Sequence, residues 1–214
     1  AFCCQMQGSI LVDREGRALR NPMTYMDGRA VRQMQTSLCH GLFRISGLNA
    51  FKALNTLRIT GGVAATPKDP LWKYHWVREN EPEIFEQADK WLDVKDYLIL
   101  RCTGQLAMTR DSAHATFLYD TRPGKEKWHP GLCRTYGVDM DHLPPVVEAT
   151  QVVGRLTRKA AEALGLASGI PVFGGGGDLL GADPHVLHAV QAALGTLRRG
   201  IGLAAAVVTD RPGV

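Results

Sequence analysis

The chain has 214 residues, a net charge of +4, 45% hydrophobic residues and 21% charged residues. This composition excludes a disordered chain, and the weak charge, without a block of consecutive basic residues, argues against a nucleic-acid or membrane-surface partner. The longest apolar run, Ile201 to Val208, is far too short to span a membrane. Five cysteines without a Cys-x-x-Cys pair indicate a reduced, cytoplasmic protein.

The first part of the chain combines one strand signal with helix signals. Residues 6–13 have a strand-like centre followed by a turn signal, and apolar residues recur at helical spacing over 29–57, with interruptions at glycines. Asp69 and Pro70 then open a helix whose apolar residues share one face. These inward residues are Trp72, Trp76 and Val77.

Further helices and strands follow. Asn80 begins a helix with an acidic first turn, and Asp93 begins another that ends at Gly104. In the first of these two helices, the side chains expected to point inward are Ile84, Phe85, Ala88 and Trp91. The later elements expected are a strand over 146–156, a helix over 157–164 and a strand over 170–173. This interleaving of strands and helices favours an α/β fold.

Four glycines and an aspartate, 174–178, directly follow the last of these strands. Glycines let the backbone approach a ligand closely, and the carboxyl edge of a sheet is where open α/β folds bind ligands. There Asp178 can accept a proton from a substrate hydroxyl. The alternative is a glycine-rich turn with a capping aspartate. The spacing fits neither a P-loop nor a dinucleotide fingerprint.

Other polar clusters are less specific. Asp27 and Arg29 can bind a polyol or form an ion pair that braces a turn. The aromatic stretch 72–76 fits a core helix first, although aromatic rings also stack on sugars. His185 and His188 have a spacing that can hold a metal, but no third ligand is placed, so no metal site is expected.

Several segments occur together in an order that is typical of one family. Residues 70–80 (Pro-Leu-Trp-Lys-Tyr-His-Trp-Val-Arg-Glu-Asn) match a family signature from which only Lys68 departs, at its opening position. The other similar segments are 5–8 (Gln-Met-Gln-Gly), 25–29 (Tyr-Met-Asp-Gly-Arg), 93–98 (Asp-Val-Lys-Asp-Tyr-Leu) with 103–104 (Thr-Gly), 109–113 (Thr-Arg-Asp-Ser-Ala, with Arg110 inserted) and 174–178 (Gly-Gly-Gly-Gly-Asp). With them the chain resembles the FGGY carbohydrate kinases, close to the xylulokinase and pentulose kinase branch.

The resemblance implies an actin-like, ribonuclease-H-like α/β fold and ATP-dependent phosphorylation of a sugar or polyol hydroxyl, with a pentulose such as xylulose favoured. It implies that Asp178 is the catalytic base and that the sugar is bound by Met6, Gln7, Asp178 and Leu179. The residues implied in support are Gln5, Asp27, Arg29, Gly176 and Gly177. ATP and Mg²⁺ are the implied cofactors, a small sugar or polyol is the implied partner, and a homodimer is compatible with the family.

The resemblance also predicts a domain organisation. Residues 1–180 correspond to the sugar-binding N-terminal domain, truncated before its first strands, and 181–214 to a divergent linker toward a C-terminal ATP-binding domain that the chain lacks. Both ATP-contacting modules are then missing, so the 214 residues alone are expected to be inactive. The alternative is a non-catalytic, sugar-binding or regulatory remnant of a sugar kinase.

Overall fold

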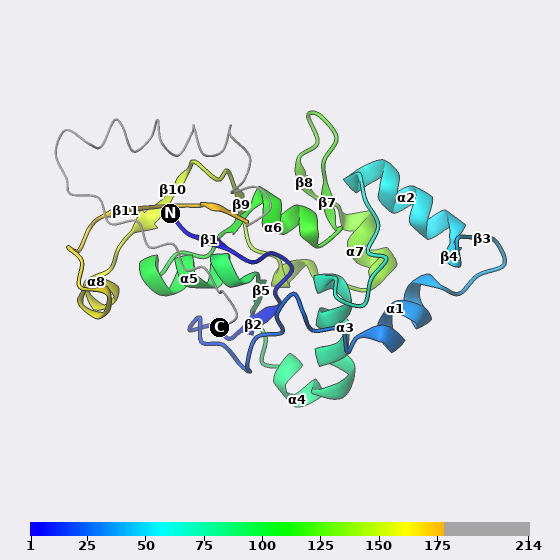
Figure 1. Cartoon of the computed structure of the whole chain (residues 1–214), viewed down its shortest axis with the longest axis horizontal. Helices are drawn as coiled ribbons and strands as arrows, with labels where there is room; N and C mark the ends of the chain where they lie inside the picture. Colours follow the sequence, from blue (N-terminus) through cyan, green and yellow to red (C-terminus); the bar gives the residue numbers. More distant parts are fainter. Residues whose placement is uncertain (178–214) are drawn as a thin grey trace, which may run out of the picture.

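The computed structural model describes residues 1–177, so Asp178, Leu179 and the predicted linker 181–214 lie outside the described residues. The helices are α1 (Val31–Leu38), α2 (Ala50–Thr60), α3 (Pro70–Asn80), α4 (Pro82–Phe85), α5 (Val94–Thr103), α6 (Arg110–Ala115), α7 (Pro130–Tyr136), the 3₁₀ turn η1 (Met140–His142) and α8 (Arg158–Leu164). Figure 1 shows α5 and α6 in the middle of the molecule, with α8 toward one end and α1 and α2 toward the other.

Short strands pair segments that are far apart in the sequence. Their bounds are β1 (Cys3–Cys4), β2 (Ile10–Val12), β3 (Arg44–Ile45), β4 (Leu48–Asn49), β5 (Lys90–Leu92), β6 (Met108–Thr109), β7 (Tyr119–Asp120), β8 (Lys127–Trp128), β9 (Val146–Val147), β10 (Val152–Arg155), β11 (Pro171–Phe173) and β12 (Gly176–Gly177). β1 pairs in parallel with β12, and β6 with β9; β2 pairs antiparallel with β5, and β10 with β11. The β1–β12 pair therefore sets the start of the chain beside the glycine-rich segment.

The signature segment 70–80 forms α3, which lies in the main hydrophobic core. Trp72 and Tyr74 are fully buried among aromatic and aliphatic side chains. Their polar atoms also have partners, since the Trp72 Nε1–H donates to the Ala64 carbonyl at 2.9 Å and the Tyr74 hydroxyl lies 2.9 Å from His142 Nδ1. Burial of large aromatic side chains with satisfied polar atoms stabilises this helix strongly. The helix is therefore a rigid support for the backbone groups that its polar side chains bind.

Capping residues fix several helix ends where the sequence predicts them. The Asp93 carboxylate accepts the Val94 N–H at the start of α5, and Gly104 ends it in a left-handed conformation with φ 73°. Thr157 caps α8 and Gly165 ends it with φ 65°. Pro70 opens α3 as expected. These ends depend on local chemistry, which is why the sequence predicts them correctly.

The predicted helix from Asn80 to Trp91 is wrong beyond its first turn. α4 is only four residues long, and Trp91 lies on β5, paired with Leu11 of β2. The Asp89 N–H donates to the Val12 carbonyl at 2.8 Å, which draws the chain into this strand pair. Trp91 points into the core from a strand, and its Nε1–H donates to Ser9 Oγ at 2.9 Å. Long-range pairing has overridden the local helical spacing.

Two other predicted elements are subdivided. The strand expected over 146–156 is two strands, β9 and β10, because each has a different partner and a turn at 148–151 separates them. The helical spacing over 29–57 becomes α1, the β3–β4 hairpin and the start of α2, which Asn49 caps. Among residues 1–177, no helix has the length and apolar character that crossing a membrane requires.

Candidate active site

Met6 lies directly against the glycine-rich segment. The parallel register pairs Cys3 with Gly176 and Cys4 with Gly177, so the chain leaving β1 reaches Met6 alongside Gly177. A Cβ at Gly177 would overlap Cγ and Sδ of Met6, so a larger residue there would displace the Met6 side chain or the backbone. Residue 177 immediately precedes Asp178 in the sequence. The two segments that the resemblance assigns to sugar binding and to proton abstraction thus meet at this strand pair.

Gln7 forms a turn in a conformation that is unfavourable for a side chain. Its φ is 65°, in the left-handed region, which costs on the order of 1–3 kcal/mol for a non-glycine residue unless its surroundings hold it. Lys73 Nζ donates 2.7 Å hydrogen bonds to the carbonyls of Gln7 and Thr24. Gln7 Nε2 donates to Asp69 Oδ1 at 3.2 Å. The start of α3 therefore holds the turn through both its backbone and its side chain.

Two of the side chains that hold this turn, Lys73 and Asp69, have shifted pKa values. Burial lowers the pKa of Lys73 to about 8, against the opposing influence of Asp27, Asp93 and Asp69. Burial also raises the pKa of Asp69, although hydrogen bonds from Thr66 act the other way. A lysine with carboxylates nearby and hydrogen bonds to two backbone carbonyls stabilises the conformation of the backbone. This is what the signature lysine does in this chain.

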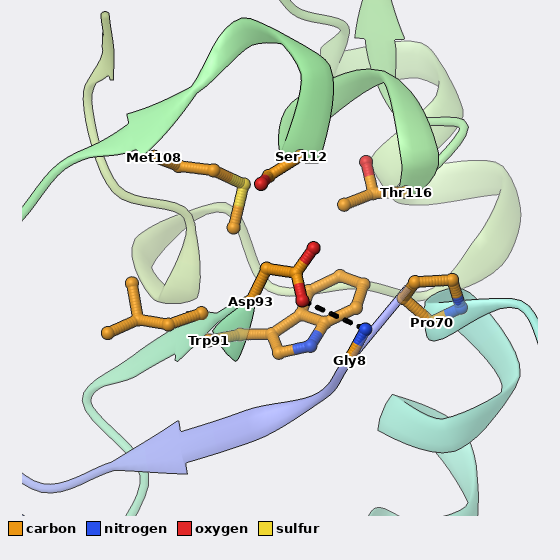
Figure 2. A pocket seen from close by; sticks show the side chains of 8 residues that line it. Gly8, Pro70, Trp91, Asp93, Met108, Ser112 and Thr116 are labelled. Atoms are coloured by element: carbon orange, nitrogen blue, oxygen red, sulfur yellow. Dashed lines mark hydrogen bonds between the residues drawn. The ribbon is translucent and has the colours of Figure 1, made fainter. Parts of the chain in front are cut away.

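The Asp93 carboxylate binds the backbone at Gly8, the residue that follows the turn. Its Oδ1 accepts the Gly8 N–H at 2.9 Å and the Val94 N–H at 2.7 Å, and burial raises its pKa to about 6. Figure 2 shows this carboxylate between Gly8 on one side and Ser112 and Thr116 on the other. The small pocket around it is lined by Gly8, Pro70, Trp91, Leu92, Asp93, Met108, Ser112 and Thr116. It has no room for a water molecule, so the residues around it are closely packed and support the turn.

A second buried cluster lies between α5 and α6. Lys95 Nζ donates to Asp111 Oδ2 at 2.7 Å, and the same oxygen accepts the Gly177 N–H at 2.6 Å. Beside them, Asp96 Oδ1 accepts the Thr109 N–H at 3.1 Å, and burial raises the pKa of Asp96 to about 8. Sequence reasoning gave these residues no role. The available signals were the family-like segments 93–98, which contains Lys95 and Asp96, and 109–113, which contains Asp111.

Asp27 and Arg29 form an ion pair, with 2.9 Å between Arg29 Nη2 and Asp27 Oδ2. The Arg29 guanidinium also lies 4.9 Å from the ring centre of Trp76, and about half of its side chain is exposed. Burial raises the pKa of Asp27, but the hydrogen bonds and charge of Arg29 outweigh it and leave the pKa lowered. The brace predicted for this turn is present. A role in sugar binding stays a prediction.

The remaining predicted residues divide into two groups. Gln5 is half-buried and immediately precedes Met6, and Gly176 is buried, its N–H donating to the Phe2 carbonyl at 3.2 Å. Asp178 and Leu179 lie outside the described residues, as do His185 and His188. Within residues 1–177, no three His, Cys, Asp or Glu side chains converge on a point where they could hold a metal ion.

The fold and these segments define a sugar-kinase domain, and comparison with known proteins gives the family. Residues 1–182 match the model of the FGGY family of carbohydrate kinases, N-terminal domain. The chain belongs to this family, and its solved neighbours confirm the expected actin-like ATPase fold.

Individual relatives are sugar kinases that are much longer than this chain. The xylulose kinase of Escherichia coli (strain K12) is 33% identical over 174 residues, covering 81% of this chain and 33% of that protein. The autoinducer-2 kinase of Yersinia pestis (strain Pestoides F) is 32% identical over 201 residues, covering 91% of this chain and 35% of that protein. The chain thus spans about a third of the length of these relatives.

Solved structures agree. The crystal structure of a "xyloylose kinase" from Brucella ovis has a TM-score of 0.66 at 30% identity, covering 81% of this chain and 33% of that one. The Plasmodium falciparum glycerol kinase with ADP, at 20% identity, has a TM-score of 0.66 and covers 84% of this chain and 35% of that one. The second likeness shows the fold alone.

Proposed function

We propose that this chain forms the sugar-binding half of an ATP-dependent carbohydrate kinase, with a pentulose such as xylulose as the substrate class. The observation that carries the proposal is the turn at Met6 and Gln7, which Lys73 of α3 holds at the Gln7 carbonyl and whose Met6 side chain lies against Gly177, the residue before Asp178. A prebuilt turn of this kind positions a sugar hydroxyl without a further ordering cost.

The steps assigned to this chain concern binding and one proton. Met6 and Gln7 contact the sugar, and Leu179 lies next to Asp178 in the sequence. Asp178 accepts the proton of the hydroxyl that is to be phosphorylated. In phosphoryl transfer most of the catalysis comes from alignment and neutralisation of charge.

ATP use is implied by the family, and Mg²⁺ is its usual companion. Within residues 1–177 no three His, Cys, Asp or Glu side chains converge where they could hold that ion, and the buried Asp93 and Asp111 carboxylates already accept hydrogen bonds from backbone N–H groups. We expect the 214 residues alone to release no ADP. The homodimer and the cytoplasmic location also remain predictions.

A thermal-melt panel tests the sugar assignment. The chain is heated with D-xylulose, D-ribulose, xylitol, glycerol, autoinducer-2 and ATP, because a ligand that binds only the folded state raises the midpoint. We expect a pentulose to raise it, Gln7→Ala to abolish the rise, and Asp178→Asn to leave at least part of it. Gln35→Ala, on the exposed face of α1, is the matched control.

Two other outcomes would change the assignment. A rise with autoinducer-2 and none with pentuloses would favour the second substrate, which is suggested by the 91% of this chain that matches an autoinducer-2 kinase. No rise with any ligand, in a chain that melts cooperatively, would favour the remnant without catalytic or sugar-binding function.

A further inference from the structure

The Asp111 carboxylate joins three elements of the structure at one oxygen. It lies in the first turn of α6, its Oδ2 accepts a hydrogen bond from Lys95 of α5 at 2.7 Å, and the same atom accepts the Gly177 N–H of β12 at 2.6 Å. The side chains of Lys95 and Asp111 are only 2% and 4% exposed. Two hydrogen bonds to one buried carboxylate oxygen, one of them from an ammonium group, make this a strong attachment.

Asp111 carries a negative charge in this position. Burial raises its pKa, but the charge and hydrogen bond of Lys95, with the Gly177 N–H, outweigh burial and leave the pKa below its usual value. An ionised carboxylate only accepts hydrogen bonds, so it matches the two donors that meet it. The charge of Lys95 is matched in turn, which keeps the pair compatible with burial.

Gly177 is confined from the opposite direction by Met6. A Cβ at Gly177 would overlap Cγ and Sδ of Met6, and it would lie 3.2 Å from Asp111 Oδ2. Because β12 is only two residues long, its own ladder gives this backbone little support. The place of Gly177 relative to Met6 therefore depends on Asp111.

We propose that Asp111, held in place by Lys95, is a positioning residue of the sugar site. By binding the Gly177 N–H it fixes the backbone of Gly177 beside Met6 and directly before Asp178. Asp111 touches neither sugar nor nucleotide and acts through Gly177. The inference rests on the proposed function, which has the sugar contact the turn at Met6 and give its proton to the residue that follows Gly177.

The test compares two double variants that both remove the buried ion pair. Lys95→Met with Asp111→Asn keeps an oxygen that can accept the Gly177 N–H, whereas Lys95→Met with Asp111→Leu removes every acceptor. Neither leaves an unpaired buried charge, which a single substitution would. The affinity for D-xylulose is measured by titration, and the Gly177 amide is followed by its ¹H–¹⁵N NMR signal and its hydrogen exchange.

In the wild-type chain we expect a downfield, exchange-protected Gly177 amide whose signal shifts when D-xylulose binds. The double variant with Asp111→Asn should keep a protected amide and an affinity close to that of the wild type. The double variant with Asp111→Leu should lose amide protection and bind D-xylulose about tenfold more weakly or worse, the loss expected from one hydrogen bond to a charged group. A merely structural role of Asp111 would lower the unfolding free energy of the Asp111→Leu double variant but would leave the affinity of its folded chain for D-xylulose close to that of the Asp111→Asn double variant.

The outcomes against the proposal are separate from those against the function. If the wild type does not bind D-xylulose, the proposed function fails in its pentulose form. If it binds D-xylulose and the two double variants bind it equally, the positioning role alone is refuted. Should a double variant not fold, the wild type decides: a Gly177 amide that exchanges freely in the folded chain overturns the proposal.

Discussion

The ammonium group of Lys73 donates a 2.7 Å hydrogen bond to the carbonyl of Gln7, a residue 66 positions earlier in the chain. A second bond of 2.7 Å goes to the carbonyl of Thr24. One buried cation on the core helix thus joins two loops of the N-terminal segment and holds Gln7 at a φ of 65°. The lysine of the family signature supports the turn at Met6 and Gln7, and it does so by binding backbone carbonyl groups.

Lys73→Met tests this support. The substitution keeps the volume and removes the donor, so two carbonyls lose a charged partner and the free energy of unfolding should fall by about 2 kcal/mol. The affinity for D-xylulose should fall as well, because the left-handed turn at Gln7 is no longer held. Urea unfolding and ligand titration measure the two effects. The control is Lys68→Met, an exposed lysine just before the same helix, which should change neither.

Gly177→Ala tests the close approach of Met6 to the glycine-rich strand. The new Cβ would overlap Met6 Cγ and Sδ, so the Met6 side chain, the turn or β12 must move, and we expect weaker sugar binding with a loss of stability of about 1–3 kcal/mol. Gly28→Ala is the matched control, since its Cβ would meet Lys68 Cγ at an ordinary 3.8 Å. Equal behaviour of the two variants in thermal melts would show that the contact with Met6 is not restrictive.

Asp96→Asn tests whether the buried Asp96 carboxyl group keeps its proton in the folded chain. Burial raises the pKa of Asp96 from 3.8 to about 8. Between those values the folded chain keeps a proton that the unfolded chain releases, so the unfolding free energy contributed by Asp96 falls as the pH rises from about 4 to about 8. The amide that replaces the carboxyl group does not titrate, and the stability of the variant relative to the wild type should therefore increase across this window.

Urea unfolding near pH 5 and near pH 8 measures this difference. Asp93, with a pKa raised to about 6, acts in the same direction between about pH 4 and 6, but it is present in both proteins and cancels in the comparison. Asp141→Asn, at an exposed position of η1, is the control for loss of a carboxylate. A stability difference between Asp96→Asn and wild type that stays constant with pH would contradict the prediction.

Arg29→Ala separates the two interpretations of the Asp27–Arg29 pair. The Arg29 side chain is half exposed, so loss of the pair should lower the unfolding free energy by less than about 1 kcal/mol. If these residues also contact a polyol, the affinity for D-xylulose falls although stability hardly changes, and this is the outcome we expect. An unchanged affinity would leave the pair as a brace for the turn at 24–29.

The sequence by itself determined the ends of α5 and α8, the α/β class and the resemblance to the family. Asp93 and Gly104 delimit α5, and Thr157 and Gly165 delimit α8, because caps and left-handed glycines act within a few residues of the chain. The signature at 70–80 identified the core helix, since its motif is contiguous. All of this information is local, and so it can be read from spacing.

Only the tertiary structure decided what meets at the site. It placed Trp91 on a strand, joined the Gly177 N–H to Asp111 and set Lys73 under Gln7. Residues 109–113 were recognisable as a family segment, yet nothing in their order shows that Asp111 binds a backbone amide 66 residues further on. Such partners are chosen by the packing of α3, α5 and α6 and by strand pairing, which bring distant residues into contact and leave no periodic trace in the sequence.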